Sequence, residues 1–367
     1  MGAARMLHHW TRSVRRILPD VHGHQVKTLT LMALSMCLAE RCESTRMVLT
    51  APVQVKLAST RRRFERFLAN TRVDQTHISR RLAAAFTRGW DGRTVEVLLD
   101  ETPFGSHLRC MKVSVTCHRR AMPLGWICYD GNDPPASQPM IVELLLRQVQ
   151  PCLPPTANVV LMADRGLSWP LLIDLCRELG WDYLLRVQGQ TVVELADGSQ
   201  CQIAQLASAR GHRWLGKARV FKTAGWYRSG VVAVWPAEQP EPWLLITSLP
   251  PRLKRCKEYR RRMWQEQSFR DEKSHGYQWD RSHVRNPEHA DRLLLAMQLA
   301  MWMTMTLGWE IDRRGWRDQV EATYRPTLSL FQLGHRAWHN PHLTALMIRG
   351  PTAIKLTPDH PPPKCVG

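Results

Sequence analysis

Apolar residues in the N-terminal part of the chain recur at the three- and four-residue spacing of amphipathic helices. This spacing predicts helices over 26–38, 60–68 and 76–86. Thr60 and Thr76 are expected to cap the second and third helices, because a Thr side chain at a helix start can accept a hydrogen bond from a free backbone N–H. The pattern therefore predicts a small all-helical domain at the start of the chain.

After Gly92 the spacing changes to that of buried strands alternating with helices. Strands are expected over 94–104, 107–120, 122–130, 158–166 and 182–187, and helices over 138–149 and 168–180. The first three strands follow one another directly, and the later strands alternate with helices. This order predicts an α/β fold with a mixed sheet flanked by helices on both faces.

The remaining segments are β-rich first and helical afterwards. Alternation over 188–237 predicts a β-rich insertion, which a strand over 242–250 closes. Arg252 to His275 is expected to form one long basic helix, and Asn286-Pro287 is a start signal for an apolar helix. The predicted segments are a helical domain (1–92), the first part of the α/β core (93–187), the insertion (188–250), a helical part (251–349) and a disordered Pro-rich tail (350–367).

Charge adds a partner to this picture. The 367 residues include 51 Lys and Arg against 32 Asp and Glu, a formal charge of +19. Residues 1–92 alone hold 16 basic and six acidic residues, and 252–262 hold seven basic residues and one acid, Glu258. A chain this basic is expected to bind a polyanion, either nucleic acid or an anionic membrane surface.

Four arginines on the second predicted helix favour nucleic acid. They lie beside Phe64 and Phe67, and aromatic residues next to basic ones suit contacts with DNA. The alternative is a solvated helix face. The arginines expected to contact DNA are Arg61, Arg62, Arg63 and Arg66.

Other classes of protein are set aside by simple signals. The longest apolar run, Leu293 to Gly308, has 16 residues and contains Gln298, so a buried helix is expected rather than a membrane span. The N-terminus lacks a charged-then-apolar leader, and the ten Cys form no C-x-x-C pair. We therefore expect a cytoplasmic protein with reduced thiols and no membrane partner.

Polar residues at helical spacing mark the candidate site. Tyr259, Arg262, Glu266 and Lys273 stand at i, i+3, i+7 and i+14, which places them on one face of the predicted basic helix. A core face would be apolar. A charged surface face is the alternative interpretation.

Two further carboxylates come at the ends of buried strands. Asp100 follows Val95–Leu99 and Asp164 follows Val159–Ala163, so both are expected at the carboxyl edge of the sheet, where open α/β sheets place their sites. The alternative is that each caps a turn or helix. Together with Glu266 they make a hard oxygen donor set of the kind that holds two Mg²⁺ ions for phosphodiester chemistry, with Mn²⁺ as a substitute.

With these residues in place, the chain resembles a known family. The spacing Tyr259-x2-Arg262-x3-Glu266-x6-Lys273 matches the YREK signature of bacterial insertion-sequence DDE transposases of the insertion sequence 4 family. LLDETPF (98–104) and VVLMADRG (159–166) resemble the blocks that carry the family's two Asp residues, and the β-rich segment lies where the family carries an insertion.

The resemblance implies an RNase H-like catalytic core with Asp100, Asp164 and Glu266 as catalytic and metal-binding residues. It implies that Tyr259 and Arg262 hold a phosphate near the transposon 5′ end and that Lys273 makes a second DNA contact. Arg186 matches a phosphate-contacting arginine, for which a surface charge is the alternative. Trp243 matches a residue on which a flipped base stacks, for which a buried strand residue is the alternative.

The implied protein is a bacterial, nucleoid-associated enzyme that cleaves the inverted-repeat ends of an insertion sequence and joins them to target DNA. A cut-and-paste route, double-stranded DNA as partner and a homodimer on paired ends are the family's expectations. Three alternatives stay open: another RNase H-like nuclease, a catalytically silent DNA-binding derivative, and a basic membrane-surface protein.

Overall fold

Five helices form the N-terminal part of the molecule in the computed structural model, which describes residues 2–105, 107–322 and 327–349. They pack around the buried side chains of Trp10, Leu29 and Phe64. The helices are α1 (Gly2–Ile17), α2 (Gly23–Ala39), α3 (Ser44–Thr50), α4 (Leu57–Ala69) and α5 (Gln75–Phe86).

Both predicted Thr caps in this part are wrong. Helix α4 begins three residues before Thr60, whose side chain is buried within it. Helix α5 is capped by Asp74, whose carboxylate accepts a hydrogen bond from the backbone N–H of His77. The carboxylate of Asp74 lies one turn before that N–H, so it takes the capping position ahead of Thr76.

A single mixed sheet follows, as the alternation of strands and helices predicts. Strand β1 pairs antiparallel with β2 and parallel with β4, and β4 pairs parallel with β5. This part contains β1 (Thr94–Phe104), β2 (Leu108–Cys117), β3 (Arg120–Asp130), β4 (Asn158–Ala163) and β5 (Asp182–Arg186).

The β-rich segment continues this sheet instead of forming a separate one. Strand β10 pairs with both β5 and β9, so the strand order is β3-β2-β1-β4-β5-β10-β9-β8-β6-β7. Its strands are β6 (Val192–Glu194), β7 (Gln200–Gln202), β8 (Arg213–Val220), β9 (Tyr227–Val234) and β10 (Trp243–Thr247). One face of the core sheet is therefore continuous with one face of the added strands.

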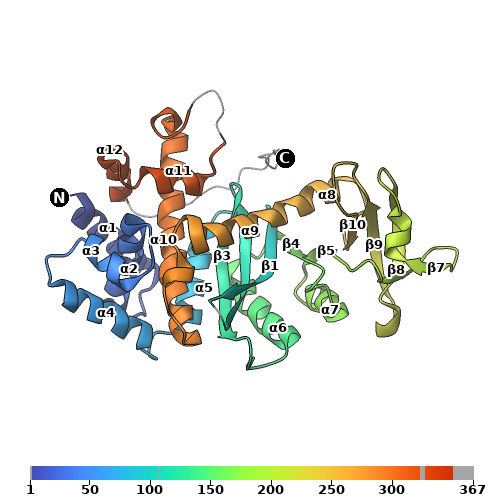
Figure 1. Cartoon of the computed structure of the whole chain (residues 1–367), viewed down its shortest axis with the longest axis horizontal. Coiled ribbons are helices and arrows are strands. Elements are labelled where there is room, and N and C mark those ends of the chain that lie inside the picture. The colour runs from blue at the N-terminus through green and yellow to red at the C-terminus, as the bar shows by residue number, and fades with distance from the viewer. Residues whose placement is uncertain (1, 106, 323–326, 350–367) are drawn as a thin grey trace.

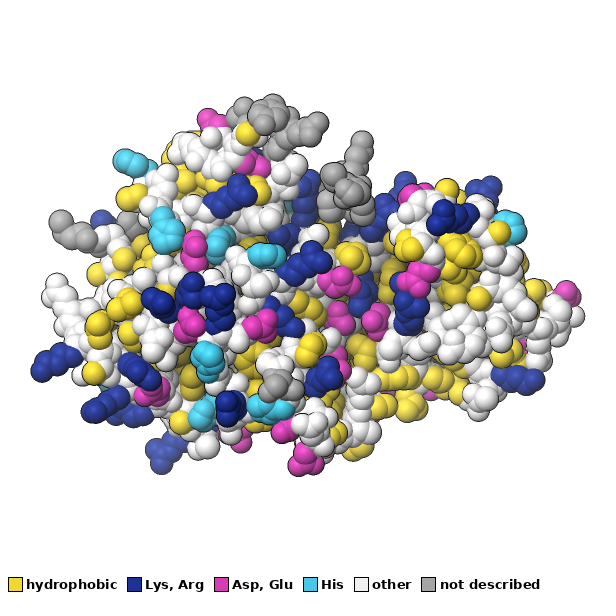
Figure 2. Space-filling model, viewed as in Figure 1, with side chains coloured by type: hydrophobic (Ala, Val, Ile, Leu, Met, Phe, Trp, Pro, Cys, Tyr) yellow, Lys and Arg dark blue, Asp and Glu magenta, His cyan; other side chains and the backbone are white. Residues whose placement is uncertain are grey.

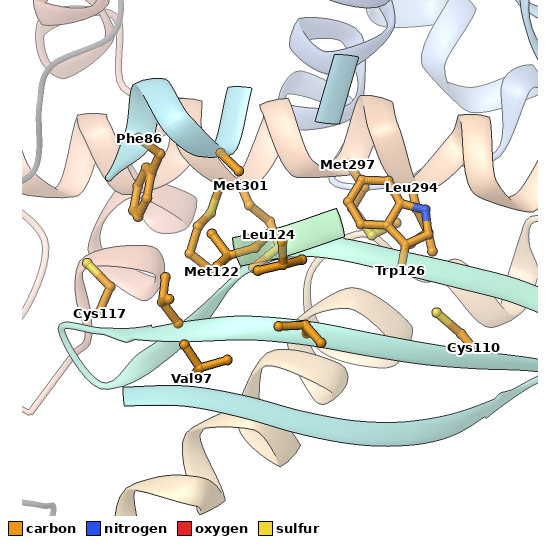
Figure 3. Packing of buried hydrophobic residues seen from close by; sticks show 14 of the residues in the cluster. Phe86, Val97, Cys110, Cys117, Met122, Leu124, Trp126, Leu294, Met297 and Met301 are labelled. Atoms are coloured by element: carbon orange, nitrogen blue, oxygen red, sulfur yellow. The ribbon is translucent and has the colours of Figure 1, made fainter. Parts of the chain in front are cut away.

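Helices cover both sides of the sheet. Helices α6 (Gln138–Val149) and α7 (Pro170–Glu178) pack against it, while the segment after β10 crosses the strands on the other face (Figure 1). Helix α10 (Pro287–Arg313) packs against β3, where Met122, Leu124 and Trp126 point toward it (Figure 3).

The crossing segment is helical but is not the uniform helix expected over 252–275. It consists of α8 (Lys254–Tyr259), a 3₁₀ turn (Arg260–Arg262), α9 (Met263–Arg270) and a π turn (Asp271–His275). Contacts with the sheet attach the segment within both irregular turns, through Arg262 in the first and through Asp271 and Glu272 in the second. Such turns commonly mark places where tertiary contacts override the regular helix.

The C-terminal part is built around α10. The Asn286 side chain accepts a hydrogen bond from His289 N, which confirms the predicted start. Helix α11 (Leu330–Ala337) lies so close to α10 that a Cβ atom on Gly308 or Gly334 would clash with backbone of the other helix, and α12 (Pro341–Thr344) follows. Within the described residues no helix is long and apolar enough to cross a membrane. The nine described Cys are free thiols, whereas Cys365 and the Pro-rich tail lie outside the described residues.

Candidate active site

Three carboxylates from separate elements meet on the face of the sheet that α9 crosses. Asp100 lies within β1, Asp164 comes directly after β4, and Glu266 lies in the first turn of α9. Leu99 and Ala163 are register partners in the parallel β1–β4 pair, so the residues that follow them lie beside each other.

The guanidinium of Arg262 joins these three side chains. Its Nη1 donates to Glu266 Oε1 at 2.8 Å, and its Nη2 lies 3.3 Å from Asp100 Oδ2 and 3.1 Å from Asp164 Oδ2. The Arg262 and Asp100 side chains are 11% and 12% exposed, whereas those of Asp164 and Glu266 are 38% and 41% exposed. The cluster therefore has a buried base and an open rim.

Burial and like charges shift the ionisation of this cluster. Burial raises the pKa of Asp100 to about 6, and the charges of Asp164 and Glu266 add to the effect, while Arg262 acts against it. Burial also acts to lower the pKa of the Arg262 guanidinium, but the neighbouring carboxylates outweigh it, so the net change is upward. Arg262 therefore stays charged and compensates part of the negative charge.

The donor set fits a hard divalent cation. Three carboxylates already gather around one positive charge, and carboxylate oxygens are the ligands that Mg²⁺ and Mn²⁺ prefer. In this conformation no three Asp, Glu, His or Cys side chains of the described chain lie close enough to hold one ion. Arg262 contacts all three carboxylates of the cluster in that conformation.

Tyr259 lies next to the carboxylates, and Trp243 packs against Tyr259. The Tyr259 hydroxyl donates to the carbonyl of Ala163, 3.2 Å away, and its ring meets the Trp243 ring edge to face at a centroid distance of 6.0 Å. Trp243 is only half-buried, and the Arg260 guanidinium lies 5.5 Å from its ring centroid. Trp243 thus combines partial exposure with a cationic neighbour.

Arg186 and Lys273 lie on either side of this group. Arg186 donates to Glu241 at 2.7 Å and to the carbonyl of Pro242, and Glu241 also pairs with Arg165. Lys273 lies in the π turn, where burial lowers its pKa and Glu272 is a neighbouring charge. No contact joins Lys273 to the three carboxylates among the described interactions.

The N-terminal arginines are distant from the carboxylates. Helix α4 packs against other helices at the end of the molecule opposite the β-rich strands (Figure 1). Arg61 pairs with Glu65, Arg63 donates to the Thr28 hydroxyl and Arg66 donates to the carbonyl of Arg62. The exposed members of the set are Arg61, Arg62 and Arg66.

Buried ion pairs that the sequence analysis missed fix the crossing segment to the sheet. Lys112 pairs with Glu272, and both side chains are 1% exposed. Arg120 pairs with Asp271 and donates to the Gln267 side chain. The sequence signal available for the first pair was a lone Lys in the apolar run of β2. In the fold, Lys112 is the register partner of Asp100 and so lies on the same face of the sheet.

The pairing register also shows that the sheet face with the site continues across the added strands. Starting at Asp100, the residues that share this face include Arg186, Trp243 and Arg228. Strand β8 ends the series with three exposed cationic residues on the same face, Arg213, Lys217 and Arg219. In the space-filling view, acidic side chains gather near the middle of the molecule with Lys and Arg beside them (Figure 2).

Comparison with known families gives a match over the central part of the chain. The family model described as the transposase DDE domain matches residues 103–303, which is more than half of the chain. The matched stretch contains Asp164, Arg262 and Glu266 and begins three residues after Asp100. No curated protein matches the chain significantly.

Proposed function

Because the chain belongs to the transposase DDE domain family, we propose that it is a DNA transposase of the insertion sequence 4 group with its active centre at Asp100, Asp164 and Glu266. The observation that carries this assignment is the meeting of the three carboxylates on one guanidinium, from within β1, from the end of β4 and from α9. The substrate is double-stranded DNA, cleaved at the inverted-repeat ends and joined to a target.

Asp100, Asp164 and Glu266 would hold the divalent ions. When bound, such ions supply Lewis-acid stabilisation of the attacking and leaving oxygens of a phosphodiester. The buried position of Asp100 sets the depth of the centre, and the half-exposed Asp164 and Glu266 leave its rim open to a DNA strand. A centre with one buried and two half-exposed carboxylates suits a large substrate that approaches from the exposed side.

The remaining residues would bind and orient the DNA. Tyr259 and Arg262 are suited to hold a phosphate beside the centre, and Arg186 is a second cation near Tyr259. Trp243 is suited to stack against a displaced base, because its ring is half-exposed and has Arg260 beside it. Lys273 and the exposed arginines of α4 are proposed as more distant DNA contacts, in a homodimer that pairs two ends on the bacterial nucleoid.

A nicking assay with divalent metal tests the assignment. With duplexes that contain the flanking inverted repeats, Asp164→Asn is expected to reduce nicking in Mg²⁺ or Mn²⁺ to background while DNA binding persists. The control is Asp133→Asn, which changes an exposed loop carboxylate after β3 and should nick like the unaltered protein. Nicking by Asp164→Asn would refute the proposed centre, and an inactive unaltered protein that still binds the ends would favour the silent derivative.

A further inference from the structure

Arg262 has an unusual set of partners for a structural arginine. One guanidinium serves three carboxylates that come from β1, the end of β4 and α9. One guanidinium is the only positively charged group in contact with all three acidic side chains among the described interactions. The side chain that gathers the carboxylates thus satisfies only part of their charge.

The Nε atom of Arg262 gives a second, independent observation. It is buried and has no hydrogen-bond partner among the described residues. Buried polar hydrogens are nearly always paired in native proteins, so an orphan of this kind calls for a partner that the chain itself does not supply. A phosphate is the matching partner, because its oxygens accept the parallel N–H pair of a guanidinium edge.

We propose that Arg262 is a built-in counter-cation that holds the three carboxylates together in the DNA-free protein and competes with divalent metal for them. This inference rests on the proposed function of the carboxylate cluster. A DNA phosphate that accepts from Nε and Nη would draw the guanidinium off the carboxylates and expose them to metal. DNA binding and metal binding then strengthen each other, since coupling between two ligands is reciprocal.

The neighbouring Arg261 provides a matched comparison. It also forms an ion pair with a buried carboxylate of β1, Glu96, but this pair lies away from the three carboxylates, and Glu96 accepts a second hydrogen bond from Thr116. Burial raises the pKa of Glu96 to about 6 in spite of Arg261. Arg261 and Arg262 are thus adjacent arginines on one segment, and only the latter contacts the proposed centre.

The test measures Mn²⁺ binding to the full-length, DNA-free protein by calorimetry, with thermal unfolding in parallel. Arg262→Gln is expected to bind Mn²⁺ about tenfold or more tightly than the unaltered protein, because a positive charge is removed from among the ligands. Its metal-free form should unfold at a lower temperature, and Mn²⁺ should raise that temperature more than it does in the unaltered protein. Arg261→Gln should leave Mn²⁺ affinity unchanged.

Two further variants separate the possible outcomes. Arg262→Lys keeps the charge but cannot reach three carboxylates at once, so it is expected to bind Mn²⁺ a few-fold more tightly and serves if Arg262→Gln fails to fold. Unchanged or weaker Mn²⁺ binding in these Arg262 variants, with binding lost in Asp164→Asn, overturns the counter-cation and leaves the proposed centre intact. Unchanged Mn²⁺ binding in Asp164→Asn would instead refute the centre itself.

Discussion

Asp291 shows how burial can dominate the ionisation of a single residue. It lies on α10, and its carboxylate accepts a hydrogen bond from the backbone N–H of Cys128 at 2.9 Å. Burial raises its pKa to about 7, against the opposing effects of the Cys128 hydrogen bond and of Arg292. A carboxylate with a raised pKa in the folded state favours folding when protonated and opposes it when charged.

The stabilisation of the fold by Asp291 is therefore expected to decrease as pH rises. The stability contributed by Asp291 is complete below the unfolded pKa of about 4 and is lost as pH rises through about 7. Asp291→Asn keeps an acceptor for Cys128 but cannot ionise. We expect its gain in unfolding free energy, measured with urea, to be about 2 kcal/mol larger at pH 8 than at pH 5, since partial exposure moderates the full shift. An equal gain at both pH values would contradict this account, and Asp133→Asn is the control.

The crossing segment is the element on which the site depends. Near its C-terminal end the Ser268 hydroxyl accepts a hydrogen bond from Ala121 N, and the pairs Lys112–Glu272 and Arg120–Asp271 follow. These contacts fix the angle at which α9 crosses β1 and β2. The position of Glu266 opposite Asp100 is therefore determined by charges located one to two turns away.

Removing one partner of the fully buried pair should be costly. Lys112→Met leaves Glu272 buried and unpaired, so we expect a loss of about 3–5 kcal/mol in unfolding free energy. The double variant Lys112→Met/Glu272→Leu should recover most of that loss, because no unpaired charge remains. Urea unfolding measures both variants.

A surface pair supplies the control for this prediction. Arg147 and Glu178 pair at 2.6 Å, but their side chains are 47% and 58% exposed. Arg147→Met should therefore lower the unfolding free energy far less than Lys112→Met does, because solvent screens an exposed pair. Two results would show that the buried pair does not hold the segment. Either Lys112→Met would lower the unfolding free energy no more than Arg147→Met does, or the double variant would lose the sum of the losses of its two single substitutions.

Across the whole molecule, fewer basic side chains are available to bind DNA than the total charge indicates. Of the seven basic residues in 252–262, Arg255, Arg261 and Arg262 form ion pairs within the chain. On β8, Arg213 and Lys217 have no carboxylate partner among the described residues. These two cations are free to meet phosphates on the same sheet face as the three carboxylates.

The salt dependence of DNA binding tests this distribution. Each lost phosphate contact lowers the slope of log affinity against log salt by about 0.9 for duplex DNA. Arg213→Gln/Lys217→Gln should therefore lower the slope by about 2, measured by fluorescence anisotropy over a salt series. Arg177→Gln also removes an exposed charge, but on α7 at the opposite face, and should leave the slope unchanged. Equal slopes in all three proteins would exclude β8 from the interface.

Local pattern predicted much of this architecture, and its limits have a physical cause. Alternation and helical spacing predicted β1 to β5 and the start of α10, because each depends on burial within one element. The ion pairs of Lys112 and Arg120 were missed, since they depend on register and on packing between elements distant in sequence. The division of 252–275 into several helical turns was missed for the same reason, as contacts with the sheet determine where the hydrogen bonding changes.

For the candidate site, sequence predicted the residue types and their order, whereas their mutual contacts came from the fold. Asp100 and Asp164 each follow an apolar run in the sequence, and Glu266 stands at fixed spacing from Arg262, so all three could be named in advance, although β1 continues past Asp100 to Phe104. That Arg262 touches all three carboxylates could not, because this requires β1 and β4 to be parallel neighbours beneath α9.

The unbroken sheet has a consequence for the length of DNA that the protein would engage. Five strand-to-strand steps separate β1, which carries Asp100, from β8. At about 4.8 Å per step they span ~24 Å, which equals the rise of ~7 base pairs of duplex. The sheet would thus set the spacing between the two DNA contacts. Phosphates bound by Arg213 and Lys217 would lie roughly two-thirds of a helical turn from the phosphodiester bond to be cut.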